Sequence, residues 1–552
     1  MNALPTAARA GLRLRGPADQ PLATPATTRG RTLRPPAPAR CATRRFAALL
    51  TYVAPLLAFA AGPALADEAA SAPATARPRL PDIRIKLADG PDQPPYTGRV
   101  FLIFTQDENR EPRHLVGWFS REPIVAFDVK DRKIGEELSL ADQKPIEFAL
   151  EAGGLPTGAW RVQAVIDRNG ATHEVLNAAG NGYSNPATLD WTDAGAKPLE
   201  LTIDQTIPRR TPASSDTRKH FRLESRLLSA FHGKKIEQVA NVFLPKDYEK
   251  SPERRYPAVY VINGFGDSET SGLGGGYQRM LASVDMTAVV IHIVADCATG
   301  HHVFADSANN GPVGTALVEE LIPALEREFR LIPESNARYV TGHSSGGWSS
   351  LWLQVAYPDT FGGCWSTAPD PVDFSAFQTV DIYAPGANMF TDAKGNPRPI
   401  SRPGRRGKSL LSRQFCELEE VLGHGGQLQS FEAVFSPRAA SGKPAKLWDR
   451  TSGAIDPEIA KAWRKYDIAD LLRRDWDKLG PKLRGKIHIW CGDEDSFYLE
   501  EAVRRLQKTV ADLGSDAKIT MLPKTTHNFS PAQMTEVARS MAEQEKQLRP
   551  GG

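Results

Sequence analysis

Short apolar runs separated by turns dominate residues 81–208. Residues rich in Gly, Pro and Asn lie between these runs, and no stretch with helical spacing intervenes. Several short strands joined by regular turns predict an antiparallel β-sandwich for this segment. We find no catalytic motif in it, and we interpret His114 and His173 as surface histidines. The clearest strand candidates are residues 98–104 (Gly-Arg-Val-Phe-Leu-Ile-Phe), 145–150 (Pro-Ile-Glu-Phe-Ala-Leu) and 160–166 (Trp-Arg-Val-Gln-Ala-Val-Ile).

Strands and helices alternate through residues 209–549. Residues 258–262 and 287–293 are apolar at successive positions, as expected for strands that helices cover on both faces. The alternation predicts an α/β domain built on a sheet of mainly parallel strands. It breaks between residues 370 and 470, where Pro, Gly and aromatic residues are frequent. Long irregular segments in compact domains are usually functional, so we predict a cap inserted over an active site.

The N-terminal residues have the pattern of an export signal. Two arginines at residues 44–45 precede an apolar run over residues 46–61, and Ala-Leu-Ala follows at residues 64–66. A basic flank, a short apolar core and an Ala-x-Ala site are typical of a secretory signal. About 16 apolar residues containing a proline are short for a membrane span. We therefore expect residues 1–66 to be a signal and N-terminal extension ending near Ala66, and residues 67–80 to be a linker. The mature chain should be periplasmic or secreted, with no membrane span.

Composition narrows the function classes further. At 552 residues the chain is long enough for two domains. The formal charge is +3, but residues 1–66 hold nine Arg and one acidic residue, so the remainder carries about −5. The negative charge of the remainder does not suit binding to nucleic acid, and the sequence has no basic stripe with interleaved aromatic residues. We therefore do not expect nucleic acid as a partner. No Cys or His spacing suggests a metal, and no cofactor is expected. The thiols outside the signal could be paired or free, and the pattern leaves this open for Cys297, Cys364, Cys416 and Cys491.

One stretch points to nucleophilic catalysis. Residues 339–348 read Tyr-Val-Thr-Gly-His-Ser-Ser-Gly-Gly-Trp, with Gly-x-Ser-x-Gly directly after a strand-like run and directly before a helix-like segment. A nucleophile elbow needs this context, because its serine sits on a strained strand-to-helix turn that small neighbours allow. We therefore predict Ser344 as the nucleophile.

An alcohol attacks a carbonyl poorly unless a base removes its proton, and the base needs an acid to orient it. Both partners follow Ser344 in the expected order, each in a loop after a strand. The sequence Gly-Asp-Glu-Asp at residues 492–495 supplies three acidic candidates, and His527 follows the last strand. Only one of Asp493, Glu494 and Asp495 can point at the histidine, and loop position alone leaves the choice open.

The tetrahedral intermediate also needs hydrogen-bond donors where its oxyanion forms. One should be the backbone N–H of Ser345, directly after the nucleophile. The other should come from the loop after the strand that ends at Ile262, where Asn-Gly-Phe-Gly-Asp occupies residues 263–267. In that loop we favour the N–H of Phe265.

Two further motifs carry weaker signals. The glycine run at residues 272–276 does not have the spacing of a phosphate-binding loop, and we predict an ordinary loop there. His301 and His302 follow a strand on the active-site side, and they could line the pocket or be structural.

On these motifs the chain resembles the esterase D and enterochelin esterase branch of the α/β-hydrolases. That branch includes S-formylglutathione hydrolases, feruloyl and acetylxylan esterases, and mycolyl transferases. The resemblance covers about residues 215–545 and implies that the acid is Asp495. An N-terminal sandwich resembles the enterochelin-esterase arrangement, while the long 370–470 segment departs from the family pattern. The segments that carry the resemblance are residues 263–266 (Asn-Gly-Phe-Gly), 342–347 (Gly-His-Ser-Ser-Gly-Gly), 357–363 (Tyr-Pro-Asp-Thr-Phe-Gly-Gly), 492–497 (Gly-Asp-Glu-Asp-Ser-Phe) and His527.

The sequence thus predicts an exported serine carboxylic-ester hydrolase: a β-sandwich (81–208), then an α/β-hydrolase domain (209–549). Its substrate would be a small-molecule or carbohydrate-linked ester, cleaved through an acyl-enzyme by Ser344, His527 and Asp495. An acyltransferase with the same triad and a non-catalytic binding protein with the hydrolase fold are the alternatives. The acyl group, the alcohol, the role of the sandwich and the oligomeric state stay open.

Overall fold

The computed structural model describes residues 80–550 apart from residues 89–94, 151–153, 193–194, 213, 272–273 and 404–408. The predicted signal, and all but the last residue of the predicted linker, lie outside the described residues. The described residues belong to one compact unit. Within them, no helix is both long enough and apolar enough to cross a membrane.

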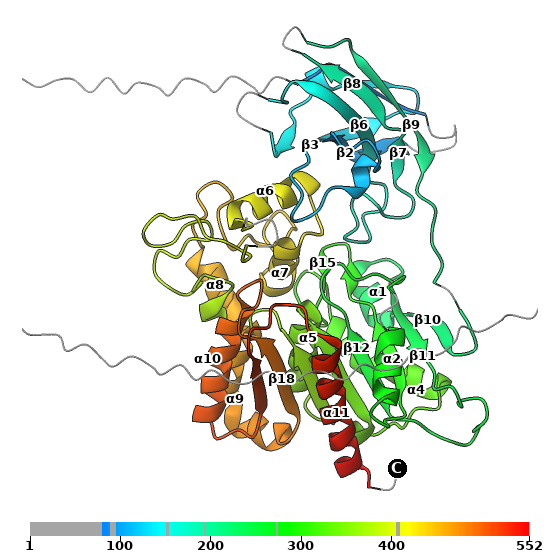
Figure 1. Cartoon of the computed structure of the whole chain (residues 1–552), viewed down its shortest axis with the longest axis vertical. Coiled ribbons are helices and arrows are strands. Elements are labelled where there is room, and N and C mark those ends of the chain that lie inside the picture. The colour runs from blue at the N-terminus through cyan, green and yellow to red at the C-terminus, as the bar shows by residue number, and fades with distance from the viewer. Residues whose placement is uncertain are drawn as a thin grey trace, which may run out of the picture. The chain divides into compact units, whose positions relative to one another are not determined.

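Nine strands between residues 80 and 207, here called the β region, form one hydrogen-bonded sheet (Figure 1). The order is β4-β1-β9-β7-β6-β2-β3-β5, and β8 pairs with β6 beside β7. Strand β6 pairs with β2, β7 and β8 and so joins the two parts of this sheet, while the sandwich arrangement stays a prediction. The strands are β1 Ile83–Leu87, β2 Tyr96–Thr105, β3 Ile124–Arg132, β4 Glu137–Ser139, β5 Ile146–Phe148, β6 Gly158–Ile166, β7 Gly182–Ser184, β8 Ala187–Trp191 and β9 Leu199–Thr206, with short 3-10 turns at Pro112–His114 and Leu140–Asp142.

Strand β2 is apolar at successive positions because both of its faces are buried. Val100, Leu102 and Phe104 point into a core shared with the other strands of the region. Phe101 and Ile103 point the opposite way, into a second buried cluster that includes residues of helix α6 (Ser412–Leu422). Successive side chains of a strand alternate between faces, so a strand covered on both sides is apolar throughout.

The second sheet confirms the predicted α/β architecture and has the α/β-hydrolase fold. Its order is β10-β11-β13-β12-β16-β17-β18-β19. The pairs β10·β11 and β11·β13 are antiparallel, and every other neighbouring pair is parallel. The carboxyl ends of the parallel strands therefore meet at one edge, where the candidate site residues lie. The strands are β10 Arg218–Glu224, β11 Glu237–Phe243, β12 Ala258–Ile262, β13 Val289–Ile293, β16 Arg338–His343, β17 Gly363–Thr367, β18 Ile487–Gly492 and β19 Lys518–Leu522; β14 (Asp296–Cys297) and β15 (Gly300–His301) form a separate small ribbon.

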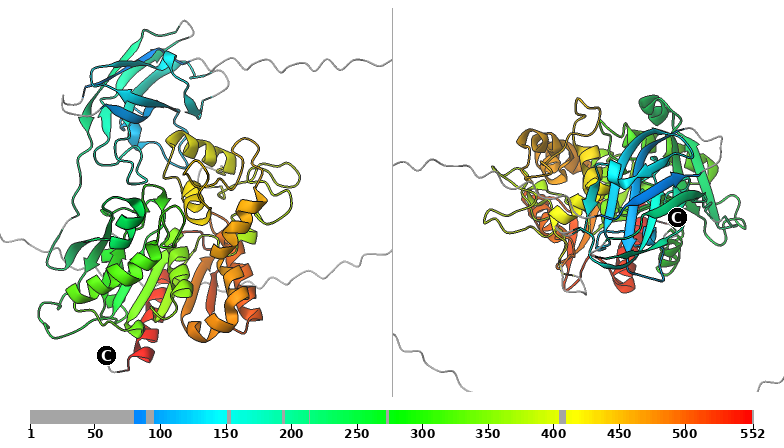
Figure 2. Two further views of the ribbon diagram at one scale, coloured as in Figure 1. Left: turned by 180° about the vertical axis from the view of Figure 1, so that it is seen from behind. Right: turned by 90° about the horizontal axis from the view of Figure 1, so that it is seen from above.

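Helices cover both faces of this sheet (Figures 1 and 2). Helices α2 and α11 pack on one face around residues such as Val259, Tyr339 and Trp365. Helices α4, α5, α9 and α10 contribute to the core on the other face, which includes Tyr260 and Val340. The helices are α1 Arg226–His232, α2 Gly274–Ala282, α3 Val313–Ala316, α4 Ile322–Glu328, α5 Ser345–Ala356, α9 Ile468–Leu483, α10 Leu499–Asp512 and α11 Pro531–Leu548, with a π-helical turn at Leu317–Leu321.

Between β17 and α9 the chain leaves the sheet, and we call residues 370–467 the cap segment. In its described part it forms α6, α7 (Gln427–Phe435), α8 (Pro457–Trp463) and long loops. Buried aromatic residues such as Phe374, Phe431 and Trp463 tie it to the main core. Its two long helices lie between the β region and the α/β sheet (Figure 1).

One expectation from the sequence is corrected here, and one question that the sequence left open is answered. The glycine run was predicted as a loop, but α2 begins at Gly274. A Cβ at this position would lie 2.1 Å from the Phe243 ring, so glycine is required by the close packing of helix on sheet. The four cysteines in the described residues are free thiols, and burial raises the pKa of the Cys297 thiol to about 11.

Candidate active site

Ser344 occupies a strained turn between β16 and α5. Its φ of 59° and ψ of −124° are a conformation that residues other than glycine rarely adopt. The flanking glycines allow the turn, because a Cβ at Gly342 would lie 2.1 Å from the carbonyl oxygen of Gly346. A Cβ at Gly346 would lie 2.0 Å from the carbonyl oxygen of Ile262. The strand, turn and helix around the serine are those that the motif predicted.

His527 and Asp495 lie at the same edge of the sheet, in the loops after β19 and β18. His527 Nδ1 is 2.8 Å from Asp495 Oδ2. The Asp495 side chain is fully buried, and its other oxygen accepts a hydrogen bond of 2.8 Å from the backbone N–H of Phe497. Among the three acidic candidates, Asp495 is the one hydrogen-bonded to His527. The carboxylate thus orients the imidazole through Nδ1, an arrangement in which the other ring nitrogen, Nε2, can exchange a proton.

The Ser344 hydroxyl points toward a carboxylate that we did not predict. Ser344 Oγ donates to Asp370 Oδ1 at 3.4 Å, and Ser345 Oγ donates to Asp370 Oδ2 at 2.6 Å. In the described residues no hydrogen bond joins Ser344 Oγ to His527. Burial raises the pKa of Asp370 to about 6. Asp370 follows β17, which is the neighbour of β16 in the sheet. Its place just after a predicted strand was the signal in the sequence that could have identified it.

His343 connects the Ser344 turn with the loop that carries His527. The rings of His343 and His527 are 4.7 Å apart, and His343 directly precedes Ser344. His343 Nδ1 lies 3.1 Å from Thr367 Oγ1. Burial lowers the pKa of His343 to about 3, so this imidazole stays neutral beside His527.

The loop after β12 passes close to Ser344. A Cβ at Gly264 would lie 3.1 Å from Cβ of Ser344, so the loop approaches as closely as an oxyanion donor requires. Phe265 follows in this loop. Ser345 is the first residue of α5, where a backbone N–H has no partner within the helix. The two predicted oxyanion donors therefore belong to the residue that follows Ser344 and to the loop whose Gly264 lies close to it.

A buried polar network holds this loop. His292 Nε2 on β13 is 2.7 Å from Asp267 Oδ2, and both side chains are at most 1% exposed. Burial acts to raise the pKa of Asp267, but hydrogen bonds from His292 and Asn263 hold it below its usual value. His301 Nε2 lies 3.0 Å from the carbonyl oxygen of Asn263, and burial lowers the pKa of His301 to about 4. His301 therefore supports the loop, which is the structural role that the sequence left open beside a place in the pocket lining.

Besides Asp370, two side chains from the described part of the cap segment reach the site, and sequence reasoning missed both. Gln427 Nε2, at the start of α7, donates to Ser345 Oγ at 3.1 Å and to Asp370 Oδ2 at 3.2 Å. Arg402 donates through its guanidinium to the carbonyl oxygen of Asp495 and forms an ion pair of 2.5 Å with Glu500. No motif marks either residue, because each acts through a contact with a segment distant in the chain.

His173 is a correction to the sequence interpretation. We expected a surface histidine, but its side chain is only 12% exposed and its Nδ1 lies 2.7 Å from Asp296 Oδ1. Burial acts to lower the pKa of His173, and the contact with Asp296 raises it above the usual value. Within the described residues, no group of three or more His, Cys, Asp or Glu side chains is arranged to hold a metal ion.

Comparison with known proteins identifies relatives of the α/β region. The family model described as "Putative esterase" matches residues 235–531, just over half of the chain. An endo-1,4-β-xylanase/feruloyl esterase of Xylanibacter ruminicola is 29% identical over 140 residues, which is 23% of this chain. The match spans only 18% of that relative's length.

Solved structures of similar proteins match the same part of the chain at low identity. A ferulic acid esterase is 13% identical with a TM-score of 0.37, covering 60% of this chain and 99% of its own. An S-formylglutathione hydrolase from Agrobacterium tumefaciens is 16% identical with a TM-score of 0.36, covering 61% of this chain and 99% of its own.

Proposed function

Because residues 235–531 match its family model, the chain belongs to the Putative esterase family, and we propose that it hydrolyses a carboxylic ester through an acyl-enzyme on Ser344. The observation that carries the proposal is the 2.8 Å hydrogen bond between Asp495 and His527 beside the strained Ser344 turn. A nucleophile, a base and an orienting acid are the groups that acyl transfer needs.

In the first half-reaction, Ser344 Oγ attacks the carbonyl carbon of the ester and His527 Nε2 takes its proton. Asp495 keeps the imidazole in the tautomer that can accept this proton and stabilises the imidazolium. The same nitrogen then protonates the departing alcohol, and the acyl group stays on Ser344. In the second half-reaction, water attacks the acyl-enzyme with His527 again as base, which releases the acid.

The oxyanion of each tetrahedral intermediate accepts hydrogen bonds from the backbone N–H groups of Ser345 and Phe265 in this proposal. One such donor typically contributes about 10²–10³ in rate. Before attack, the Ser344 hydroxyl must leave its long contact with Asp370, which requires rotation about χ1 toward His527. The neutral state of His343 is favourable here, because a second positive charge would oppose formation of the imidazolium.

The test is labelling with a fluorophosphonate probe together with hydrolysis of p-nitrophenyl esters. We expect the probe to label the wild-type chain at Ser344. Ser344→Ala should remain folded while esterase activity falls by several orders of magnitude, because only binding and the oxyanion donors then remain. Ser350→Ala, a matched change in the same helix whose hydroxyl donates to the Gly347 carbonyl, should leave the activity near that of the wild type.

Two results would contradict the proposal. Retention of more than about a tenth of the activity in Ser344→Ala would place the nucleophile elsewhere. An unlabelled wild-type chain would indicate a binding protein that keeps the fold. Product analysis with an added acceptor alcohol separates hydrolysis from acyl transfer, since a transferase would yield the new ester instead of the free acid.

We also propose that the protein is exported and that the mature chain begins near Asp67. This rests on the Arg-Arg pair, the apolar run over residues 46–61 and the Ala-Leu-Ala site that precedes Asp67. N-terminal sequencing of the exported protein tests it. A chain that retains residues 46–61 in the membrane fraction would show that the apolar run is an anchor.

A further inference from the structure

Trp118 of the β region lies among aromatic rings from three other parts of the chain. Its ring stacks on Phe265 with centroids 5.6 Å apart, and it meets Phe415 of α6 edge-on at 5.3 Å. It also meets Phe497, in the loop that carries Asp495, at 6.1 Å. Phe497 in turn lies edge-on to His527 at 5.0 Å. The ring of Phe497 therefore lies between Trp118 and the proposed base. Trp118 also contacts the proposed oxyanion loop directly.

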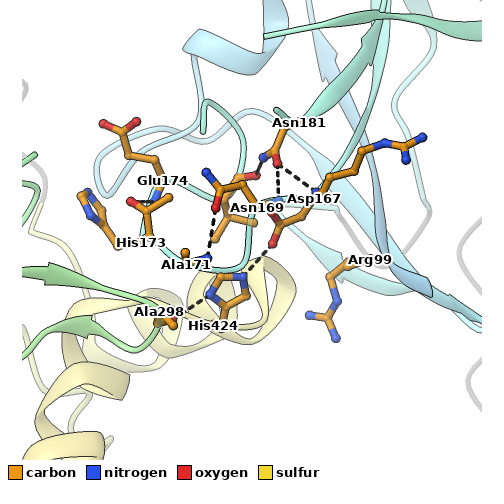
Figure 3. A network of polar contacts seen from close by, with 12 residues as sticks. Arg99, Asp167, Asn169, Ala171, His173, Glu174, Asn181, Ala298 and His424 are labelled. Atoms are coloured by element: carbon orange, nitrogen blue, oxygen red, sulfur yellow. Dashed lines mark hydrogen bonds and ion pairs between the residues drawn. The ribbon is translucent and has the colours of Figure 1, made fainter. Parts of the chain in front are cut away.

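A buried interface holds the β region in this place. Outward-facing residues of β2, β3 and β6 form one apolar cluster with Leu418 and Val421 of α6. Arg99 on β2 donates to the carbonyl oxygen of Val421 at 3.0 Å. At the side of this interface, His424 Nε2 lies 2.7 Å from Asp167 Oδ2 (Figure 3). Apolar burial with hydrogen-bonded polar groups at its border is the pattern of a stable interface.

A second side chain of the β region contacts the same loop. The ring of His173 lies 5.4 Å from the ring of Phe265 and is held by its contact with Asp296. The Phe265 ring is thus contacted by two β-region side chains, Trp118 and His173. Because Phe265 is also the proposed oxyanion donor, the β region borders the place where the ester carbonyl would bind.

We propose that Trp118 is a specificity-determining residue, through which the β region forms one wall of the ester site and limits the size of the acyl group. The inference rests on the proposed function and extends it to a part of the chain that carries no catalytic motif. We assign Trp118 to the side of the site where the acyl group would bind, because its ring stacks face-on against Phe265 of the oxyanion loop. Its contact with Phe497, on the side where His527 would protonate the leaving alcohol, is longer and edge-on.

The experiment measures kcat/KM of the full chain for p-nitrophenyl acetate and p-nitrophenyl octanoate. Removing the indole opens the acyl side, so Trp118→Ala should raise the octanoate-to-acetate ratio about tenfold or more. Trp118→Phe keeps one ring and should give an intermediate ratio. The control is Phe119→Ala, which removes the neighbouring aromatic side chain, 61% exposed to solvent, and should leave the ratio unchanged.

Fluorophosphonate labelling of Ser344 separates this inference from the proposed function. If the wild-type chain is not labelled and hydrolyses neither ester, the proposed function fails and the inference falls with it. If the chain is labelled and active but Trp118→Ala leaves the ratio unchanged, the inference alone is overturned. The same holds if Phe119→Ala raises the ratio as much. Should Trp118→Ala fail to fold, Trp118→Phe decides, and an unchanged ratio in that variant overturns the inference.

Discussion

Three neighbouring acidic residues follow β18, and their surroundings in the structure differ. Asp495 is buried and contacts His527, whereas the backbone N–H of Asp493 bonds to the carbonyl of Leu522 on the adjacent strand. In a turn, side chains one residue apart point in different directions. The neighbours of Asp495 therefore cannot substitute for it without moving the loop.

We predict that Asp495→Asn lowers kcat by about 10³–10⁴, because the amide leaves His527 in the wrong tautomer while keeping the shape of the loop. Asp493→Asn is the matched control and should cost about tenfold or less, since that side chain lies outside the proposed triad. Steady-state kinetics on both variants, with circular dichroism to compare folding, make the measurement. A larger loss in Asp493→Asn would show that the acid is misassigned.

Among the elements, the cap segment contacts both the Ser344 turn and the Asp495 loop, which carry candidate catalytic residues. Gln427 reaches the serine turn from α7, and Arg402 reaches the acid loop from the long connection before α6. The backbone N–H of Arg402 also donates to the carbonyl of Ser496 at 2.7 Å. Through these contacts the cap segment can influence the geometry of the site as well as cover it.

Arg402→Ala should lower kcat by about ten- to a hundredfold, since the Asp495 loop loses its brace and a small displacement of a catalytic group is costly. Arg402→Lys should recover only part of the loss, because an ammonium cannot reproduce the fork that contacts both Asp495 and Glu500. Arg413→Ala is a matched control in the same segment. Arg413 donates to the carbonyl of Thr451, away from the acid loop, and its loss should leave kcat within about twofold.

Steady-state kinetics of Arg402→Ala, Arg402→Lys and Arg413→Ala test whether the contact of Arg402 with the acid loop matters for kcat. Equal losses in Arg402→Ala and Arg413→Ala would mean that the cap segment acts through its general stability, without a specific contact to the acid loop. Thermal unfolding of each variant shows whether stability differs among them.

Across the whole molecule, the β region and the cap segment meet through a titratable contact. His424, two residues after the end of α6, lies between Asp167 of the β region and the carbonyl oxygen of Ala298 (Figure 3). The hydrogen bond to Asp167 is the main cause that raises the pKa of His424, against the effects of burial and of nearby Arg99. The folded pKa lies above the unfolded value of about 6.5, so the stabilisation is fully present below that pH. It is lost as the pH rises through the raised pKa.

We therefore predict that amide exchange in α6, corrected for its intrinsic pH dependence, becomes several-fold faster between pH 6 and pH 8 in the wild-type chain. Asp167→Asn should show faster exchange already at pH 6 and less change with pH. Asp190→Asn, which alters an exposed carboxylate on β8, should behave like the wild type. Identical pH profiles for the wild type and Asp167→Asn would contradict the role given to this contact.

The sequence was sufficient where the physical signal is local. Apolar runs predicted the parallel strands, and the Gly-x-Ser-x-Gly motif predicted the strand, turn and helix around Ser344, because side-chain spacing and glycine geometry act over a few residues. The order of the three candidate catalytic residues along the chain also follows from the sequence. The fold and the family are confirmed on this basis, whereas the roles of Ser344, Asp495 and His527 stay predictions.

Tertiary structure decided which distant segments meet. Asp370 contacts Ser344 because β17 lies beside β16, and Arg402 contacts Asp495 across about ninety residues of chain. The β region was predicted to carry no chemistry, yet its docking on α6 brings Trp118 against Phe265. Contacts of this kind depend on how separate surfaces pack, and the pattern of a single segment does not contain that information.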